Sequence, residues 1–235
     1  MPSTLKPTAR QHTIFHYAWI IVIVATVVQG VGSAIRMSFG VMVEPLVFSF
    51  GWSAGTVGLA YGLMSIISAL FAPVAGWMGT RFGARKTMYI GLVLFLIGMI
   101  WTALATNIYE FYISYGIIFG FAQSMFLVPV IPAVAIWFKK SLGLATGIII
   151  GMWSLGPALV IQIMGIMLDK LGWQTTFISS GVVGTVIMLV ALQYFRNTPS
   201  EKNLLPYGSE ETINKEKTTK TNSNNYSFNL QNIIY

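Results

Sequence analysis

The sequence predicts an all-α membrane protein, and three observations support this fold class. The 235 residues are 55% hydrophobic and only 9% charged, with a mean hydropathy of +0.70. An average soluble domain is about 45–50% apolar with glycine included, and about 25% charged. Six long apolar runs follow one another without strand-like alternation, and a polar segment of different composition begins at Arg196.

Each of the six apolar runs is long enough to cross a bilayer as a helix. The hydrocarbon core is about 30 Å thick and takes about 20 helical residues, and in lipid a helix satisfies its own backbone. We therefore predict a six-helix transmembrane bundle over residues 17–195. Its spans are Tyr17–Val43, Ser53–Met78, Thr87–Thr106, Glu110–Trp137, Leu142–Met167 and Thr175–Phe195.

The distribution of positive charge predicts the orientation of the bundle. Lysine and arginine are retained on the cytoplasmic side of short loops. With the N-terminus inside, 12 cations lie on the cytoplasmic side and Lys170 alone lies outside. We therefore predict an N-in, C-in protein of the plasma (inner) membrane. The net charge of +7 follows from this topology and does not indicate nucleic-acid binding.

Two segments outside the bundle are predicted to be cytoplasmic, namely residues 1–16 and residues 196–235. The second is rich in Asn, Thr, Ser, Lys and Glu, a composition typical of a solvated segment. Its last stretch, SFNLQNIIY (227–235), becomes apolar again. We interpret residues 196–235 as the start of the central loop of a longer protein, so that the chain is a fragment.

The connection between the second and third spans, GWMGTRFGARKTM (76–88), has a specific arrangement of glycines and cations. Cytoplasmic cations can anchor spans in any order, whereas three glycines allow a tight turn and close approach of another backbone. The stretch resembles the G-x-L-a-D-R-x-G-R-R/K loop of the major facilitator superfamily. Thr80 replaces the family's acid and Ala84 replaces a basic residue; a threonine can accept a hydrogen bond but cannot complement a helix N-terminus with charge.

The resemblance implies that this loop latches the inner gate of a transporter against its opposite half. The residues to which we assign this gating role are Gly76, Gly79, Thr80, Arg81, Gly83, Arg85 and Lys86.

Further stretches are similar to monocarboxylate-porter-like and oxalate/formate-exchanger-like members of that family. They are WFKKSLGLATGIIIGMWSLGP (137–157), RNTPSEKNLLPYG (196–208), IRMSFGVMVEPL (35–46) and FGWSAGTVGLAYGL (50–63). Family members generally have twelve spans in two halves, with substrate between them. The resemblance therefore implies that this chain is an N-terminal six-helix half, completed by a missing C-terminal half or a second copy of itself.

Arg36 is the clearest ionisable residue within a predicted span, where a charge costs about 2.5–3.5 kcal/mol on insertion scales. Gln29 and Ser33 share its helix face through the i, i+4, i+7 spacing. A cation at this place in monocarboxylate porters implies that Arg36 binds the substrate anion, and a guanidinium matches a carboxylate with two donors. The alternative is that Arg36 extends to the lipid headgroups. Further candidate substrate-binding residues are Tyr61, Ser65, Gln123 and Trp153.

We expect a secondary transporter of a small organic anion, a mono- or dicarboxylate, that works by alternating access. We expect no enzyme activity, cofactor or metal site, because the sequence has no cysteine, no Walker-type loop and no H-E-x-x-H motif. Apart from Glu110 at the external end of the fourth span, the predicted spans hold no acid for proton coupling, so coupling to protons stays open. Two alternatives also remain: a six-span structural or channel-like subunit that assembles as an oligomer, and a transporter of a neutral solute.

Overall fold

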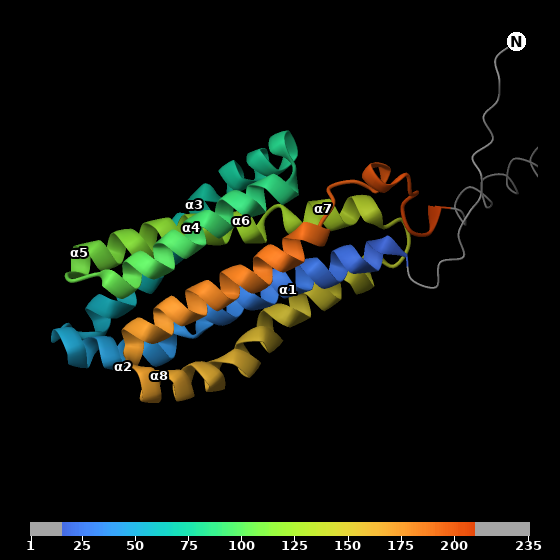
Figure 1. Cartoon of the computed structure of the whole chain (residues 1–235). Coiled ribbons are helices and arrows are strands. Elements are labelled where there is room, and N and C mark those ends of the chain that lie inside the picture. The colour runs from blue at the N-terminus through green and yellow to red at the C-terminus, as the bar shows by residue number, and fades with distance from the viewer. Residues whose placement is uncertain (1–15, 210–235) are drawn as a thin grey trace, which may run out of the picture.

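A computed structural model describes residues 16–209, which are almost entirely helical. The long helices run along one common axis and form an elongated bundle (Figure 1). In chain order the elements are α1 (Tyr17–Met37), α2 (Phe39–Phe50), α3 (Ala54–Phe82), α4 (Ala84–Leu104), α5 (Ile108–Phe111), the π-helix η1 (Tyr112–Phe119), α6 (Gly120–Leu127), α7 (Val130–Trp137), α8 (Leu142–Tyr194) and the 3-10 helix η2 (Pro199–Lys202).

The first predicted span is longer than expected and is broken at Ser38. The Ser38 hydroxyl donates to the Ala34 carbonyl at 2.7 Å, and its backbone leaves the regular helix between α1 and α2. The helical run Tyr17–Phe50 continues past the predicted end at Val43, because it ends only where Gly51 takes a left-handed conformation (φ 69°). Glycine adopts such a φ at little steric cost.

The predicted loop between the second and third spans is a single-residue turn. Helix α3 extends through Phe82 and α4 starts at Ala84, so Gly83 alone reverses the chain, with φ 89° and ψ 146°. The prediction that the second span ends at Met78 and the third starts only at Thr87, with a loop between them, is therefore wrong. Glycine at the one strained position lets both helices continue up to it.

The fourth predicted span, Ile108–Trp137 in the structure, consists of four helical pieces, α5, η1, α6 and α7. Asn107 caps its start by accepting from the Glu110 backbone N–H at 2.9 Å. Its last break lies at Val128 and Pro129, as expected because proline lacks a backbone N–H.

By length and composition, five helical runs among the described residues can cross a membrane. Helix α8 accounts for the difference from the six predicted spans, because it joins the last two predicted spans in one 53-residue run. Within this run Gly172 is not helical (φ 76°, ψ 167°). In Figure 1 the gold first part and the orange second part of α8 meet beside α2. We name this end of the bundle the Gly172 end, and the opposite end, which contains the Gly83 turn, the Gly83 end.

Helix α1 lies at the centre of the packing, and α8 crosses it closely. A Cβ atom added at Gly156 of α8 would lie 2.6 Å from the Gly30 carbonyl oxygen of α1, so only glycine permits this crossing. The run formed by α1 and α2 is mostly buried, whereas α3 and α8 are mostly exposed. The bundle thus has a buried centre and two largely open helices.

The segment after α8 folds back onto the Gly83 end. The Tyr207 carbonyl accepts from the Lys139 N–H at 2.9 Å, and the Tyr207 N–H donates to the Trp137 carbonyl at 2.8 Å. The Tyr207 ring also packs edge-on against His16, with 5.5 Å between ring centroids. Both ends of the described chain therefore lie at the Gly83 end.

Candidate functional site

Arg36 lies on the last turn of α1, directly before the break at Ser38. About 20 Å of α2 helix separate it from the Gly172 end, at 1.5 Å per residue. The Arg36 side chain is half-buried and its partners are protein groups.

Three of the predicted site residues surround the Arg36 guanidinium. Its Nη2 donates to the Ser65 hydroxyl at 3.3 Å, and its Cζ lies 5.6 Å from the centroid of the Tyr61 ring. The same Cζ lies 5.8 Å from the centroid of the Trp153 ring. Such distances correspond to cation–π contact, which holds the guanidinium between aromatic faces. The structure thus brings together residues of α1, α3 and α8 that the sequence analysis selected separately.

The guanidinium keeps unused hydrogen-bonding capacity. Its Nε is buried and has no hydrogen-bond partner within residues 16–209, and no carboxylate pairs with Arg36 in that part of the chain. A buried N–H without an acceptor is unfavourable by about 1–3 kcal/mol, more when it is charged. The site therefore offers positive charge and a free donor direction to an anion.

Aromatic rings form a wall beside this cation. Phe39, one turn after Arg36, stacks on Tyr61 with centroids 5.7 Å apart and on Tyr115 with centroids 4.5 Å apart. The Tyr61 hydroxyl approaches the Met37 sulfur at 3.8 Å. The predictions from sequence left Phe39 and Tyr115 out, because an aromatic in an apolar run gives no signal of its own there.

Gln29, Ser33 and Gln123 lie apart from the Arg36 contacts and are almost fully buried. Gln29 donates to the Phe126 carbonyl at 3.2 Å, and Gln123 donates to the Gly32 carbonyl at 3.1 Å. Ser33 donates to the Gly30 carbonyl of its own helix at 3.1 Å. The two amides join α1 to α6, so the hydrogen bonds of all three residues are internal to the bundle.

The predicted gating residues divide into three groups, of which the first packs against the break in the fourth span. A Cβ atom at Gly79 would lie 2.9 Å from the Cβ of Pro129, and one at Gly76 would lie 3.4 Å from a methyl group of Val128. These glycines let α3 approach the junction between α6 and α7.

The second group attaches the Gly83 turn to the end of α8. The Arg85 Nε donates to the Leu192 carbonyl at 3.2 Å, and its Nη2 donates to the Gln193 carbonyl at 3.2 Å. The last carbonyls of a helix carry partial negative charge, so a cation there is stabilising. Arg85 therefore holds two parts of this bundle together.

Asn197 completes this attachment, and the sequence analysis did not select it. Its Oδ1 accepts from the Arg85 backbone N–H at 2.9 Å, and its side chain packs against Gly83. Its only sequence signal was the R-N-T-P stretch that resembles the exit from a sixth span.

The third group, Thr80, Arg81 and Lys86, is exposed. Thr80 donates to the Trp77 carbonyl at 2.8 Å, and the Arg81 guanidinium lies 5.7 Å from the centroid of the Trp77 ring. These contacts lie within α3, so the polar heads of Arg81 and Lys86 are available to another surface.

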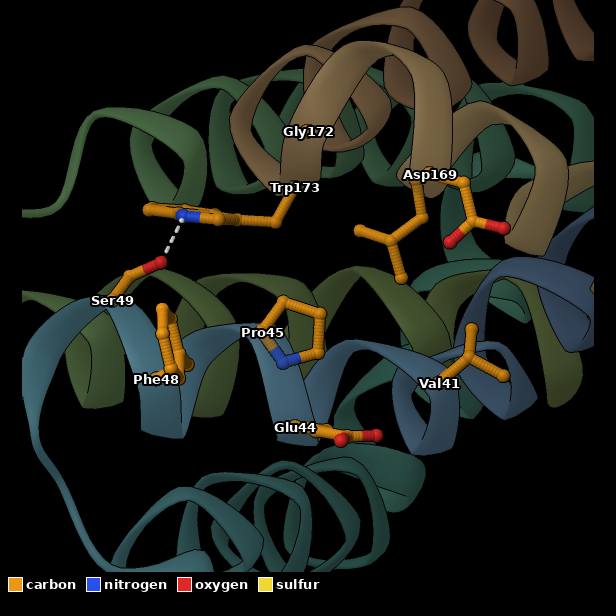
Figure 2. Close-up of a pocket in the computed structure, with 9 residues that line it drawn as sticks. Val41, Glu44, Pro45, Phe48, Ser49, Asp169, Gly172 and Trp173 are labelled. Atoms are coloured by element: carbon orange, nitrogen blue, oxygen red, sulfur yellow. Dashed lines mark hydrogen bonds between the residues drawn. The ribbon is translucent and has the colours of Figure 1, made fainter.

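A separate hollow of about 450 Å³ opens at the Gly172 end between α2 and the turn of α8 (Figure 2). Across it the Trp173 indole donates to the Ser49 hydroxyl at 3.1 Å. Glu44 and Asp169 line it from α2 and α8, but Arg36 does not belong to its lining. Among the described residues no group of three or more His, Cys, Asp or Glu is arranged to hold a metal ion.

Curated proteins with similar sequences include several monocarboxylate transporters. The chain is 23% identical to human monocarboxylate transporter 11 over 167 residues, which cover 71% of this chain and 36% of that protein. It is 24% identical to human monocarboxylate transporter 14 over 206 residues, covering 84% and 40% respectively. The chain thus spans well under half the length of these relatives.

The fold is also similar to that of a solved transporter. The inward open conformation of the xylose transporter XylE from E. coli superposes with a TM-score of 0.68 at 20% identity. The match covers 78% of this chain and 49% of XylE. The sequence model of the Major Facilitator Superfamily matches residues 22–223, which is most of the chain. The chain therefore belongs to the major facilitator superfamily.

Proposed function

We propose that this chain forms one half of a secondary transporter that moves a small organic anion, a mono- or dicarboxylate, by alternating access. The observation that carries the proposal is Arg36, which is half-buried among α1, α3 and α8 with its Nε unpaired and without a carboxylate partner in residues 16–209. Ionisable residues at membrane depth are costly and mark substrate or ion pathways. An anion would supply both the countercharge and the missing acceptor.

The proposed anion site consists of Arg36, Ser65, Tyr61 and Trp153. A guanidinium matches the two oxygens of a carboxylate with two parallel donors, whereas the aromatic faces favour an organic rather than a strongly hydrated ion. Similarity to monocarboxylate transporters supports this substrate class. Gln29, Ser33 and Gln123 would act behind this site by holding α1 in place.

The chain would need a second half to enclose the substrate. It spans 36% and 40% of two monocarboxylate transporters, which supports a fragment of a longer protein. The open faces of α3 and α8 support this too, because Gly58, Gly62, Gly147 and Gly151 have no atom within 4 Å of an added Cβ. A C-terminal half is the occupant we propose, and a second copy of this chain is the alternative.

We infer six spans with both ends in the cytoplasm of a plasma-membrane protein. The reversal at Gly172 divides α8 into two legs, and both ends of the described chain lie at the Gly83 end, which requires an even number of crossings. Seven described cations also lie at or after turns of that end, namely Arg81, Arg85, Lys86, Lys139, Lys140, Arg196 and Lys202. The positive-inside rule then places the Gly83 end in the cytoplasm.

Gating would take place at the same end. Arg85 is occupied by the α8 carbonyls, so Thr80, Arg81 and Lys86 are the residues that would contact the opposite half. If protons are coupled to transport, they would travel on the substrate carboxyl group or on groups of the second half.

The experiment is uptake into proteoliposomes, with the protein as its gene encodes it and with Arg36→Gln and Arg36→Lys. Radiolabelled acetate, lactate, oxalate and succinate are the anionic probes, and xylose is the neutral probe. Losing a charge-assisted hydrogen bond costs about 1.5–3 kcal/mol, so Arg36→Gln should lower anion affinity about 10- to 100-fold. Arg36→Lys should retain part of the uptake, because it keeps the charge.

Each other outcome would count against a definite part of the proposal. Unchanged anion uptake by Arg36→Gln would mean that Arg36 does not bind the substrate and extends to the lipid headgroups instead. Saturable xylose uptake without anion uptake would replace the substrate class by a neutral solute. Uptake that does not saturate would favour a channel-like subunit.

A further inference from the structure

The hydroxyl of Tyr115 is a polar group that is not among the contacts of the proposed Arg36 site. Its side chain is 1% exposed, and its hydroxyl is buried without any hydrogen-bond partner among the described residues. Buried hydroxyls are normally paired, and each exception calls for an explanation. The inference below rests on the proposed function of the Arg36 site.

The neighbouring hydroxyls on the same π-helix do have partners. Tyr112 donates to the Thr56 carbonyl at 2.9 Å, and the Ser114 hydroxyl accepts from Thr102 at 3.1 Å. Unpaired hydroxyls also occur on Thr26 and Thr185, but a helical threonine can turn its short side chain to the carbonyl one turn earlier. A tyrosine hydroxyl is too far from its own backbone for this, so Tyr115 needs a partner from elsewhere.

The position of Tyr115 relates it to Arg36. Its ring stacks on Phe39, and Phe39 in turn stacks on Tyr61, whose ring contacts the Arg36 guanidinium. Two of the four buried unpaired side-chain atoms in the described chain, Arg36 Nε and Tyr115 Oη, therefore border one aromatic cluster.

The π-helical conformation is a second unusual feature at this position. η1 spans Tyr112–Phe119 and is held from two sides by close contacts: Gly116 meets Leu63 of α3, and Gly98 of α4 meets Ser114 and Phe119. π-helical segments are rare and occur frequently at functional sites. The wider turn of this segment is thus packed in place where it presents Tyr115 to the cluster.

We propose that Tyr115 is a second polar contact for the anion bound by Arg36, and that its hydroxyl donates to an oxygen of that anion. Tyr115 would act on affinity and specificity, since a hydroxyl donor adds a directed hydrogen bond to the charge attraction of the guanidinium. An anion placed between the two would satisfy both unpaired donors at once.

The test replaces only the hydroxyl, with Tyr115→Phe, in the protein as its gene encodes it. Uptake of labelled lactate and oxalate into proteoliposomes is measured together with the melting temperature in detergent. We expect the half-saturation concentration to rise about three- to tenfold, with maximal rate nearly unchanged. Tyr112→Phe is the matched control, because it removes a paired hydroxyl from the same segment and should leave the half-saturation concentration unchanged.

Arg36→Gln measured in parallel separates failure of this inference from failure of the proposed function. If Arg36→Gln loses anion uptake while Tyr115→Phe keeps its half-saturation concentration and melts at a higher temperature, Tyr115 is an unpaired core hydroxyl and the inference is wrong. If neither variant changes uptake, the proposed anion site itself is wrong. A rise in half-saturation concentration for Tyr115→Phe alone, without loss of melting temperature, supports the contact with the anion.

Discussion

Arg81 and Arg85 lie on either side of the turn at Gly83, and their side chains meet different surroundings. Arg85 donates to the carbonyls of Leu192 and Gln193 at the end of α8. Arg81 is exposed, and within the described residues its guanidinium contacts the Trp77 ring of its own helix. Two cations of one motif thus have separable roles, one within the bundle and one directed outward.

We expect Arg85→Ala to lower the stability of the folded protein by about 1 kcal/mol, because two helix-end carbonyls lose a cationic donor at a partly exposed site. Arg81→Ala should leave stability unchanged and slow transport, because the exposed guanidinium would contact the opposite half during gating. The melting temperature of each variant in detergent tests the effect on stability, and the uptake rate in proteoliposomes tests the effect on transport. Equal melting temperatures for the two variants would contradict the division of roles.

At the scale of elements, glycines occur in two different environments. On η1 and α6, Gly116 and Gly120 meet α3 closely, and a Cβ at Gly120 would lie 2.8 Å from the Met64 carbonyl oxygen. On α8, Gly147 and Gly151 face open space, although the G-x-x-x-G spacing is the same. Small residues at this spacing favour close helix contact, and within the described chain such contact occurs at the first pair and not at the second.

We expect Gly120→Ala to destabilise the bundle by about 1–3 kcal/mol, because the new methyl group meets backbone that cannot move aside. Gly147→Ala should leave the melting temperature of this half unchanged, since nothing lies within 4 Å of the new Cβ. The comparison is made by thermal unfolding of the two variants in detergent.

In the protein as its gene encodes it, reduced uptake by Gly147→Ala would support packing of a second half on α8. A Gly120→Ala variant that melts like the wild type would contradict the close contact between α6 and α3.

At the scale of the whole molecule, charge is distributed unequally between the two ends. The Gly83 end has cations on the turns after α3 and α7 and after α8, and the described ends of the chain lie there. The Gly172 end has Glu44, Glu110 and Asp169 with the single cation Lys170. This asymmetry predicts the orientation of the bundle in a membrane.

The absence of cysteine from the sequence makes this orientation directly testable. We expect Lys170→Cys to react with a membrane-impermeant thiol reagent added outside intact cells. Lys139 is an exposed residue at the Gly83 end, before the start of α8, and Lys139→Cys should react only after permeabilisation. The reverse pattern would invert the topology, and labelling of both from outside would contradict a membrane crossing by the first leg of α8, which separates the two positions.

The sequence by itself determined the class of this protein, because hydropathy and helix length depend on local composition. It predicted the apolar helical runs and the resemblance to the major facilitator superfamily, and it singled out Arg36 as a charge within a span. It also selected Tyr61, Ser65 and Trp153, which the structure brings to Arg36. A polar residue in an apolar run is visible without any knowledge of its neighbours.

Only the tertiary structure decided which of these residues meet. The amides of Gln29 and Gln123 share the polar signal of Ser65, yet they bond to backbone carbonyls across the α1 to α6 contact. The pairing of Arg85 with Leu192 joins residues more than 100 positions apart, and the unpaired Tyr115 hydroxyl follows from a π-helix wedged between α3 and α4. These contacts depend on where helices cross, and helix crossings are set by packing between distant segments rather than by the periodicity within any one of them.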